Sequence, residues 1–284
     1  MRRRFGWLTP YLFLLPGGLW LLAFFIVPMV VMASVSLQEG SLSTGYQLTW
    51  NFGIFPQAIA DSWPQIVRSL IYALIVTGLT LAIGYPMAYT IAFRGGRFKS
   101  ILLLLVILPF FTSFLIRTLS WKLILSDNGF LLGTLKSWGI LGSGFQLIGE
   151  PIAVISGLTY NFLPFMVLPV YVALEKVDAR LVEAATDLYA SRRQAFLRVT
   201  LPLSMPGVFA GSLLTFIPAV GDFINAQILG SRDTTMVGNV VQRLFLQTND
   251  YPRAAALSFV LIAAILVMVV VYARAVGSEE LTSG

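Results

Sequence analysis

Six stretches of this sequence are long and apolar enough to cross a lipid bilayer. A helix needs about 20 mostly apolar residues to span the hydrocarbon core. The loops between the stretches are too short for an independent soluble domain, so we expect a single transmembrane domain over residues 1–284. The expected spans are 11–35, 66–93, 101–125, 152–174, 207–229 and 254–273.

The composition supports a membrane protein and excludes several other classes. Hydrophobic residues make up 57% of the chain and charged residues only 11%, whereas a soluble domain carries about 25% charged residues. There is too little polar surface here for a soluble globule or a disordered chain. The sequence has no His and no Cys, which excludes Ser-His-Asp and Cys-His nucleophiles, His/Cys zinc sites and disulfides. We therefore expect no metal site and none of these catalytic sites.

Residues 95–100 offer the nearest approach to a phosphate-binding loop. A P-loop needs Gly directly before its Lys, and here Phe98 precedes Lys99. We expect no nucleotide or other cofactor in this chain. Any active transport must draw its energy from a partner or from an ion gradient.

Basic residues indicate the orientation of the spans. They are concentrated at the amino end, after the second span, after the fourth span and at the carboxyl end. The opposite loops hold only Lys136, Arg232, Arg243 and Arg253. Because cytoplasmic loops are enriched in Lys and Arg, we expect both termini to be cytoplasmic. The net charge of +6 then reflects membrane topology, and we expect no nucleic-acid partner.

The amino end resembles a signal peptide only in its basic residues, Arg2, Arg3 and Arg4. The apolar run that follows is longer than the ~7–15 residues of a signal core, so we expect it to be retained as the first span. Residues 2–10 form either a short interfacial helix or a frayed basic tail.

An amphipathic helix is expected outside the membrane, between the fifth and sixth spans. Its apolar positions fall on one helical face and end at Pro252; they are Val237, Val240, Val241, Leu244 and Phe245. This helix either packs over the bundle or faces an extracytoplasmic partner.

The cytoplasmic segment 175–203 differs from every other loop. Leu181, Ala184, Ala185 and Leu188 recur at helical spacing. A second short helical run, 194–199, follows a break at 190–191, and we expect Leu201-Pro202 to stop it. The periodicity indicates a helical hairpin that either docks in a groove of another protein or lies on lipid headgroups.

Within this segment, Glu183-Ala184-Ala185, Tyr189, Val199 and Leu201-Pro202 resemble the signature loop of ABC-importer permeases. The family usually has Gly where this chain has Tyr189, and Gly adopts a positive φ more cheaply than Tyr. The resemblance implies that the loop couples to a cytoplasmic ATPase. The residues that it assigns to this coupling are Glu183, Ala184, Ala185, Leu188, Tyr189, Leu201 and Pro202.

Longer strings are similar to the spermidine/putrescine permease subfamily of ABC importers; they are residues 111–117, 164–169 and 217–223. The match weakens at 225–227 and returns at 229–230. This resemblance implies an all-α type I ABC importer permease fold with six transmembrane helices in the plasma (inner) membrane of a prokaryote. It also implies a second homologous permease subunit, two ATPase subunits that hold ATP and Mg, and an extracytoplasmic substrate-binding protein.

The fifth span is interrupted by Pro218, Gly221, Asp222 and Asn225. A carboxylate facing lipid costs about 2.5–3.5 kcal/mol, so Asp222 should face protein or a watery cavity. It either stabilises a cationic amine on the substrate path or pairs with Arg117 or with the partner permease. The candidate path residues are Asp222, Trp121, Tyr160, Asn161 and Arg117.

These patterns together predict the permease subunit of an ATP-driven ABC importer that carries a polyamine. Within the same class, ferric iron, thiamine or an aminophosphonate remain as cargoes. An ion-driven secondary transporter and an intramembrane enzyme remain as alternative classes, although the first needs no docking loop and the second needs an acid or base partner for Asp222 within the membrane.

Overall fold

The computed structural model describes residues 9–142 and 144–277. Most of the described chain is helical, and one short β-hairpin supplies its strands. Most of the expected interfacial helix at 2–10 lies outside the described residues. By internal contacts the chain divides into two compact units. One comprises the residues up to Ser62 together with Val241–Ala263, and the other comprises Trp63–Val240 together with the segment from Ala264.

The first unit contains the first expected span and an outer hairpin. The span is formed by α1 (Thr9–Leu21), a π-helical turn (Leu22–Ile26) and α2 (Val27–Val35). The antiparallel strands β1 (Gln38–Ser41) and β2 (Gly45–Leu48) follow. A side chain is excluded at Gly40, because a Cβ atom there would lie 2.0 Å from the carbonyl oxygen of Gly45. The sequence analysis did not predict this β-hairpin.

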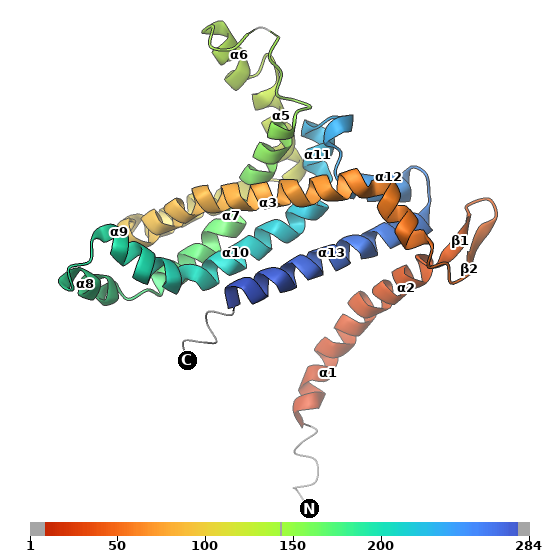
Figure 1. Ribbon diagram of the computed structural model, residues 1–284, viewed down its shortest axis with the longest axis horizontal. Helices are drawn as coiled ribbons and strands as arrows, with labels where there is room; N and C mark the ends of the chain where they lie inside the picture. Colours follow the sequence, from red (N-terminus) through yellow and green to blue (C-terminus); the bar gives the residue numbers. More distant parts are fainter. Residues whose placement is uncertain (1–8, 143, 278–284) are drawn as a thin grey trace, which may run out of the picture. The chain divides into compact units, whose positions relative to one another are not determined.

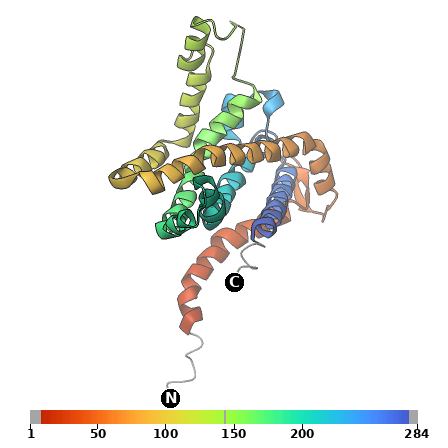
Figure 2. The ribbon, with the colours of Figure 1, turned by 60° about the vertical axis from the view of Figure 1, so that its left-hand side comes forward.

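The second unit holds a helical bundle, within which α7 and α10 pack along α3 (Figures 1 and 2). Small residues permit this close approach: a Cβ atom on Gly207 would lie 2.6 Å from the carbonyl oxygen of Pro169. The helices that form the expected spans here are α3 (Ile54–Arg94), the pair α4 (Lys99–Ile107) and α5 (Phe114–Leu125), α7 (Pro151–Glu175), α10 (Leu201–Gly221) and α13 (Tyr251–Gly277). The short helices are α6 (Phe130–Ser137), α8 (Ala179–Asp187), α9 (Arg192–Ala195), α11 (Ile224–Leu229) and α12 (Val237–Leu246). The boundaries between the two units fall within α3, α12 and α13.

The third expected span is bent rather than continuous. The segments Gly96–Phe111 and Phe114–Ser137 meet at an angle of 95°. Thr112 and Ser113, at the break, have extended ψ angles of 148° and 136°, which no helix accommodates. Among the described residues, five helices are long and apolar enough to cross a membrane, or six if the bent pair is one span. The six expected spans agree with the second count.

The expected stop at Leu201-Pro202 is wrong. The chain from Arg192 to Gly221 is helical throughout, with a π turn at Phe196–Thr200. In this turn the backbone N–H of Leu201 donates to the carbonyl of Phe196. Proline disrupts an α-helix because it lacks an N–H and its ring clashes with the carbonyl four residues earlier. Near the start of a helix the missing N–H costs little, and Pro202 lies at the start of α10, directly after the π turn.

Two other expected boundaries also move. The second span starts at Ile54, well before residue 66, and contains Pro64. The fifth span ends at Gly221, and α11 is a separate short helix rather than its continuation. The amphipathic helix expected between the fifth and sixth spans is confirmed as α12, in which Val237 and Val240 are buried; its position outside the membrane stays a prediction.

Candidate functional site

The segment 175–203 forms the expected helical hairpin, and each of its helices is capped at the start. Asp178 begins α8 by accepting a hydrogen bond from the backbone N–H of Arg180 (2.9 Å). Ser191 and Gln194 form a capping box that begins α9. Such caps satisfy backbone N–H groups that have no partner inside the helix. The hairpin therefore has a defined shape at the end of α7.

The turn between the two helices is made by Tyr189. Its φ is +61°, so the left-handed conformation is adopted even though glycine is absent. Its N–H donates to the carbonyl of Thr186, and the N–H of Ala190 donates to the carbonyl of Ala185, both at 3.0 Å. These two bonds make a Schellman ending for α8. The side chain of Tyr189 is 98% exposed and that of Leu188 is 81% exposed.

The other candidate coupling residues lie on two elements, α8 and α10. Glu183 and Ala184 are exposed on α8, and Ala185 is half-buried beside them. Leu201 and Pro202 lie at the start of α10, after α9 and the π turn. The hairpin thus presents an acidic and small-residue face together with two unusually exposed large side chains.

Replacing Tyr189 with Gly is expected to stabilise this turn. A non-glycine residue in the left-handed region costs roughly 1–2 kcal/mol. Because the ring of Tyr189 is exposed, its contacts offset little of that cost. Amide hydrogen exchange in residues 180–190 should slow about fivefold, as measured by mass spectrometry. Tyr189→Ala is the control, because it removes the ring and keeps the Cβ atom; equal slowing in both variants would contradict the backbone explanation.

The five candidate path residues gather around α5, α7 and the break before α11. Arg117 and Trp121 lie on α5, Tyr160 and Asn161 lie on α7, and Asp222 follows the last residue of α10. The structure adds two residues to this cluster, Thr118 on α5 and Asn225 on α11.

Hydrogen bonds run through the cluster from Arg117 to Asp222. The Nε of Arg117 donates to Oδ1 of Asn161, and Nδ2 of Asn161 donates to Oδ1 of Asn225 (3.0 Å). Asn225 in turn donates to Asp222, from its backbone N to Oδ1 (2.8 Å) and from Nδ2 to Oδ2 (3.2 Å). Thr118 accepts from Asn161 (3.2 Å) and donates to Asn225 (3.4 Å). We call the path from Arg117 through Asn161 and Asn225 to Asp222 the amide chain. Every donor along it points from the cation toward the anion.

Arg117 and Asp222 are therefore linked without direct contact. Within the described part of the chain, no ion pair within 4.0 Å joins them. Both side chains belong to residues that are only 9% exposed, so each would be costly to bury without partners. The two asparagines supply those partners. The direct Arg117–Asp222 pair, one of the two alternatives from the sequence, is not present within the chain.

Each end of the amide chain also stabilises a break in a helix. Asp222 accepts from Asn225 and so caps the start of α11. Arg117 donates to the carbonyl of Pro109 (2.8 Å) at the bend between α4 and α5. Its guanidinium lies 5.2 Å from the ring centre of Phe110 and 5.5 Å from that of Phe114, which adds cation–π attraction.

An aromatic pair lies beside the amide chain. The rings of Trp121 and Tyr160 stack with centres 5.2 Å apart and planes 2° apart. Trp121 donates from Nε1 to Ser156 (3.3 Å). Gly157 is one turn from Tyr160 on α7, and a Cβ atom there would approach Trp121 Cδ1 at 3.2 Å and Asn225 Oδ1 at 3.1 Å. The pair and the amide chain are thus adjacent parts of one site.

Sequence reasoning did not identify Thr118, and it gave Asn225 no role in the site. For Asn225 the available signal was its position three residues after Asp222, which is the spacing of a helix cap; Thr118, which directly follows Arg117, carried no such signal. This signal becomes informative only once α5, α7 and α11 are known to meet.

Comparison with known proteins decides the family. Residues 81–277 match the model of the binding-protein-dependent transport system inner membrane component. The chain belongs to this family of ABC-importer permeases.

Curated relatives and solved structures agree with this assignment. Over 257 residues, 90% of this chain, it is 39% identical to the spermidine/putrescine transport system permease protein PotB of Haemophilus influenzae and 36% identical to PotB of Escherichia coli K12. The alignments cover 90% and 94% of those proteins. The fold resembles a chain in the crystal structure of a bacterial alginate ABC transporter in complex with alginate pentasaccharide-bound periplasmic protein, with a TM-score of 0.72, 22% identity and 96% of each chain covered.

As a permease of this family, the chain is a multi-pass inner-membrane transport subunit rather than an enzyme. The type I importer fold expected from the sequence agrees with the structural neighbour. The apolar helices that are long enough to span a membrane agree with the expected location.

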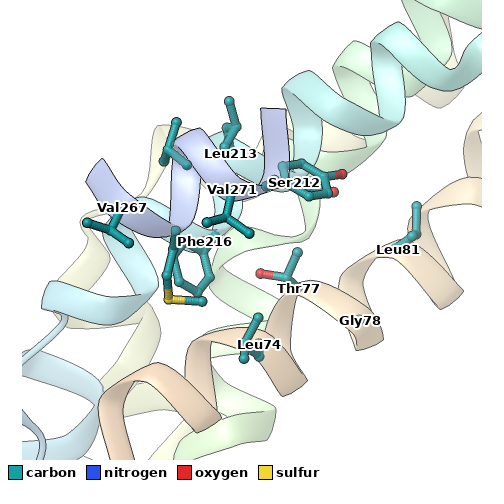
Figure 3. A pocket seen from close by; sticks show the side chains of 12 residues that line it. Leu74, Thr77, Gly78, Leu81, Ser212, Leu213, Phe216, Val267 and Val271 are labelled. Carbon is teal, nitrogen blue, oxygen red and sulfur yellow. The ribbon is translucent and has the colours of Figure 1, made fainter. Parts of the chain in front are cut away.

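A cavity of about 490 Å³ lies elsewhere in this permease, between α3, α10 and α13. Figure 3 shows Leu74 and Thr77 of α3 opposite Phe216 of α10 and Val271 of α13. As far as the described residues go, its lining includes no charged side chain, and the hydroxyl of Thr77 already donates to the carbonyl of Ala73 (2.7 Å). A charged solute would lose its hydration here and gain no ionic partner. The amide chain and its aromatic pair are therefore the better candidate path.

Proposed function

We propose that this permease carries polyamines, spermidine and putrescine, inward across the membrane as part of an ATP-driven importer. The observation that carries the proposal is its 36–39% identity to PotB proteins over 90% of the chain. The relatives are named for spermidine/putrescine transport. The residues of the candidate path are chemically suited to such a cargo.

We further propose that the working assembly contains a second homologous permease, two ATPase subunits that hold ATP and Mg, and an extracytoplasmic substrate-binding protein. The family description names binding-protein-dependent transport, which supports the last of these. The lack of a phosphate-binding loop in the sequence supports a separate ATPase. With both termini in the cytoplasm, the hairpin α8–α9 lies on the ATPase side.

In this proposal the hairpin is the coupling element. ATP binding draws the two ATPases together, and the exposed face around Glu183, Leu188 and Tyr189 follows them. The motion passes into α10 through the uninterrupted helix from Arg192. The pore then changes from outward to inward access.

The cargo would meet the cluster where α10 ends and α11 begins. An ammonium group is attracted by the Asp222 carboxylate and by the face of the Trp121–Tyr160 pair. Tyr160 is 38% exposed, so part of this pair is accessible. The guanidinium of Arg117 is held in place by Asn161 and the carbonyl of Pro109.

The test is uptake by the complete importer in proteoliposomes. The chain should be purified together with the ATPase, permease and binding protein that are encoded beside it. We expect ATP-dependent accumulation of radiolabelled spermidine, displaced by unlabelled putrescine and unaffected by thiamine, ferric iron or an aminophosphonate. Displacement by one of the latter alone would replace the polyamine assignment, and uptake driven by an ion gradient without ATP would overturn the importer class.

A further inference from the structure

The helix that leaves the cytoplasmic hairpin begins with a phenylalanine that inserts between two tyrosines of another helix. Phe196 is the first residue of the π turn between α9 and α10. Its ring lies edge-on to Tyr85, at 5.8 Å and 89°, and to Tyr89, at 5.9 Å and 76°. Edge-to-face arrangements of this kind are attractive and directional. The hairpin thus has a specific side-chain connection to α3.

The receiving surface on α3 is firmly held. Tyr85 is buried, and its hydroxyl shares a hydrogen bond of 2.8 Å with Ser204 of α10. Tyr89 contacts Phe93 at 4.8 Å between ring centres. Phe196 itself packs against the core cluster formed by α3, α7 and α10. A displacement of Phe196 therefore acts on well-packed side chains rather than on a mobile loop.

A second connection between the base of the hairpin and the body is much weaker. Glu175 and Lys99 approach at 3.4 Å, with side-chain exposures of 47% and 33%. Exposed ion pairs of this kind stabilise little. The aromatic contact is therefore the stronger of the two connections.

The π turn gives this contact a particular mechanical property. The backbone bond from Leu201 N–H to the Phe196 carbonyl closes a turn wider than an α-helical one, and such turns are positions where a helix can bend or shift register. A rigid helix would carry hairpin motion directly into α10 alone. With a π turn at the junction, the ring of Phe196 directs part of that motion into α3.

We propose that Phe196 is a positioning residue for coupling, which transmits movement of the hairpin to α3 through Tyr85 and Tyr89. This inference rests on the proposed function, because it requires an ATPase beneath the hairpin. We expect that without the ring of Phe196 the ATPases still hydrolyse ATP but transport less polyamine for each ATP.

The test is the number of ATP molecules hydrolysed per polyamine imported by the complete importer in proteoliposomes. Phe196→Ala should leave ATP hydrolysis within about twofold and raise this ratio roughly 10-fold, a size typical of coupling between sites. Phe196→Tyr keeps the ring and should restore the ratio. Tyr89→Leu should raise the ratio in the wild-type background and add little to Phe196→Ala, because both changes remove the same contact.

Phe209→Ala is the matched control. It makes the same truncation on α10, where the ring of Phe209 stacks on Tyr272 at 5.0 Å, and it should leave the ratio unchanged. An unchanged ratio in Phe196→Ala, or an equal change in both variants, overturns the role of Phe196. If the wild-type importer hydrolyses ATP without importing a polyamine, the proposed function is wrong, and the inference, which rests on it, is wrong as well.

Discussion

Spermidine uptake should fall about 100-fold when Asp222 is replaced by Asn, while the importer still assembles. That loss corresponds to roughly 3 kcal/mol, within the range of about 2–5 kcal/mol for removing one partner of a buried charge pair in binding, here the carboxylate that meets the ammonium of the cargo. Asn keeps an oxygen that can accept from the backbone N–H of Asn225, so the cap of α11 is largely retained. The measurement is the initial rate of ATP-dependent uptake against spermidine concentration. Asp233→Asn is the control, since Asp233 is an exposed carboxylate shortly after α11.

A second variant separates the two roles that Asp222 can have. If the carboxylate mainly balances Arg117 through the two asparagines, the double variant Arg117→Gln with Asp222→Asn should regain uptake, because both buried charges are gone. If Asp222 attracts the ammonium of the cargo, the double variant should remain as slow as Asp222→Asn. We expect the second result. Unchanged uptake in the single variant would assign Asp222 to structure alone.

Charge reversal at Glu183, on α8 of the helical hairpin, is also expected to stop transport. Glu183→Lys should insert normally, because the residue is exposed on α8. It should weaken association with the ATPase at least about 30-fold, as disruption of an interface hot spot does. The measurement is the amount of ATPase retained during gentle affinity purification, together with spermidine uptake.

The matched control for this reversal is Asp233→Lys, which makes the same charge change at an exposed site on the expected outer side. It should retain the ATPase. Full retention of the ATPase and normal uptake in Glu183→Lys would show that α8 lies on lipid headgroups instead, the alternative that periodicity allowed.

The positions of the membrane helices could be predicted well because they depend on local properties. The length of an apolar run and the thickness of a bilayer together decide whether a segment can span. Their internal breaks could not be predicted in the same way. Pro109 and Pro202 both interrupt apolar helical sequence, yet the chain bends by 95° just after the first and continues through the second. The difference lies in the turn geometry around each proline.

The turn at Tyr189 shows a different limit of prediction. The family pattern implies a residue with positive φ at this position, a conformation that Tyr adopts at a higher energetic cost than Gly. The structure keeps the conformation with φ at +61°, because the two Schellman hydrogen bonds and the capped helices on either side hold the turn. Flanking structure thus outweighs a local preference of about 1–2 kcal/mol.

By itself, the sequence determined that this chain is an integral membrane permease with a helical hairpin on its cytoplasmic side. Hydrophobic run length, charge placement and a spaced motif are all properties of contiguous residues. Only the tertiary structure decided how Arg117 and Asp222 are related. Their charges lie on separate elements and are joined through Asn161 and Asn225, and which turns of α5, α7 and α11 face one another depends on packing between helices that are far apart in the chain.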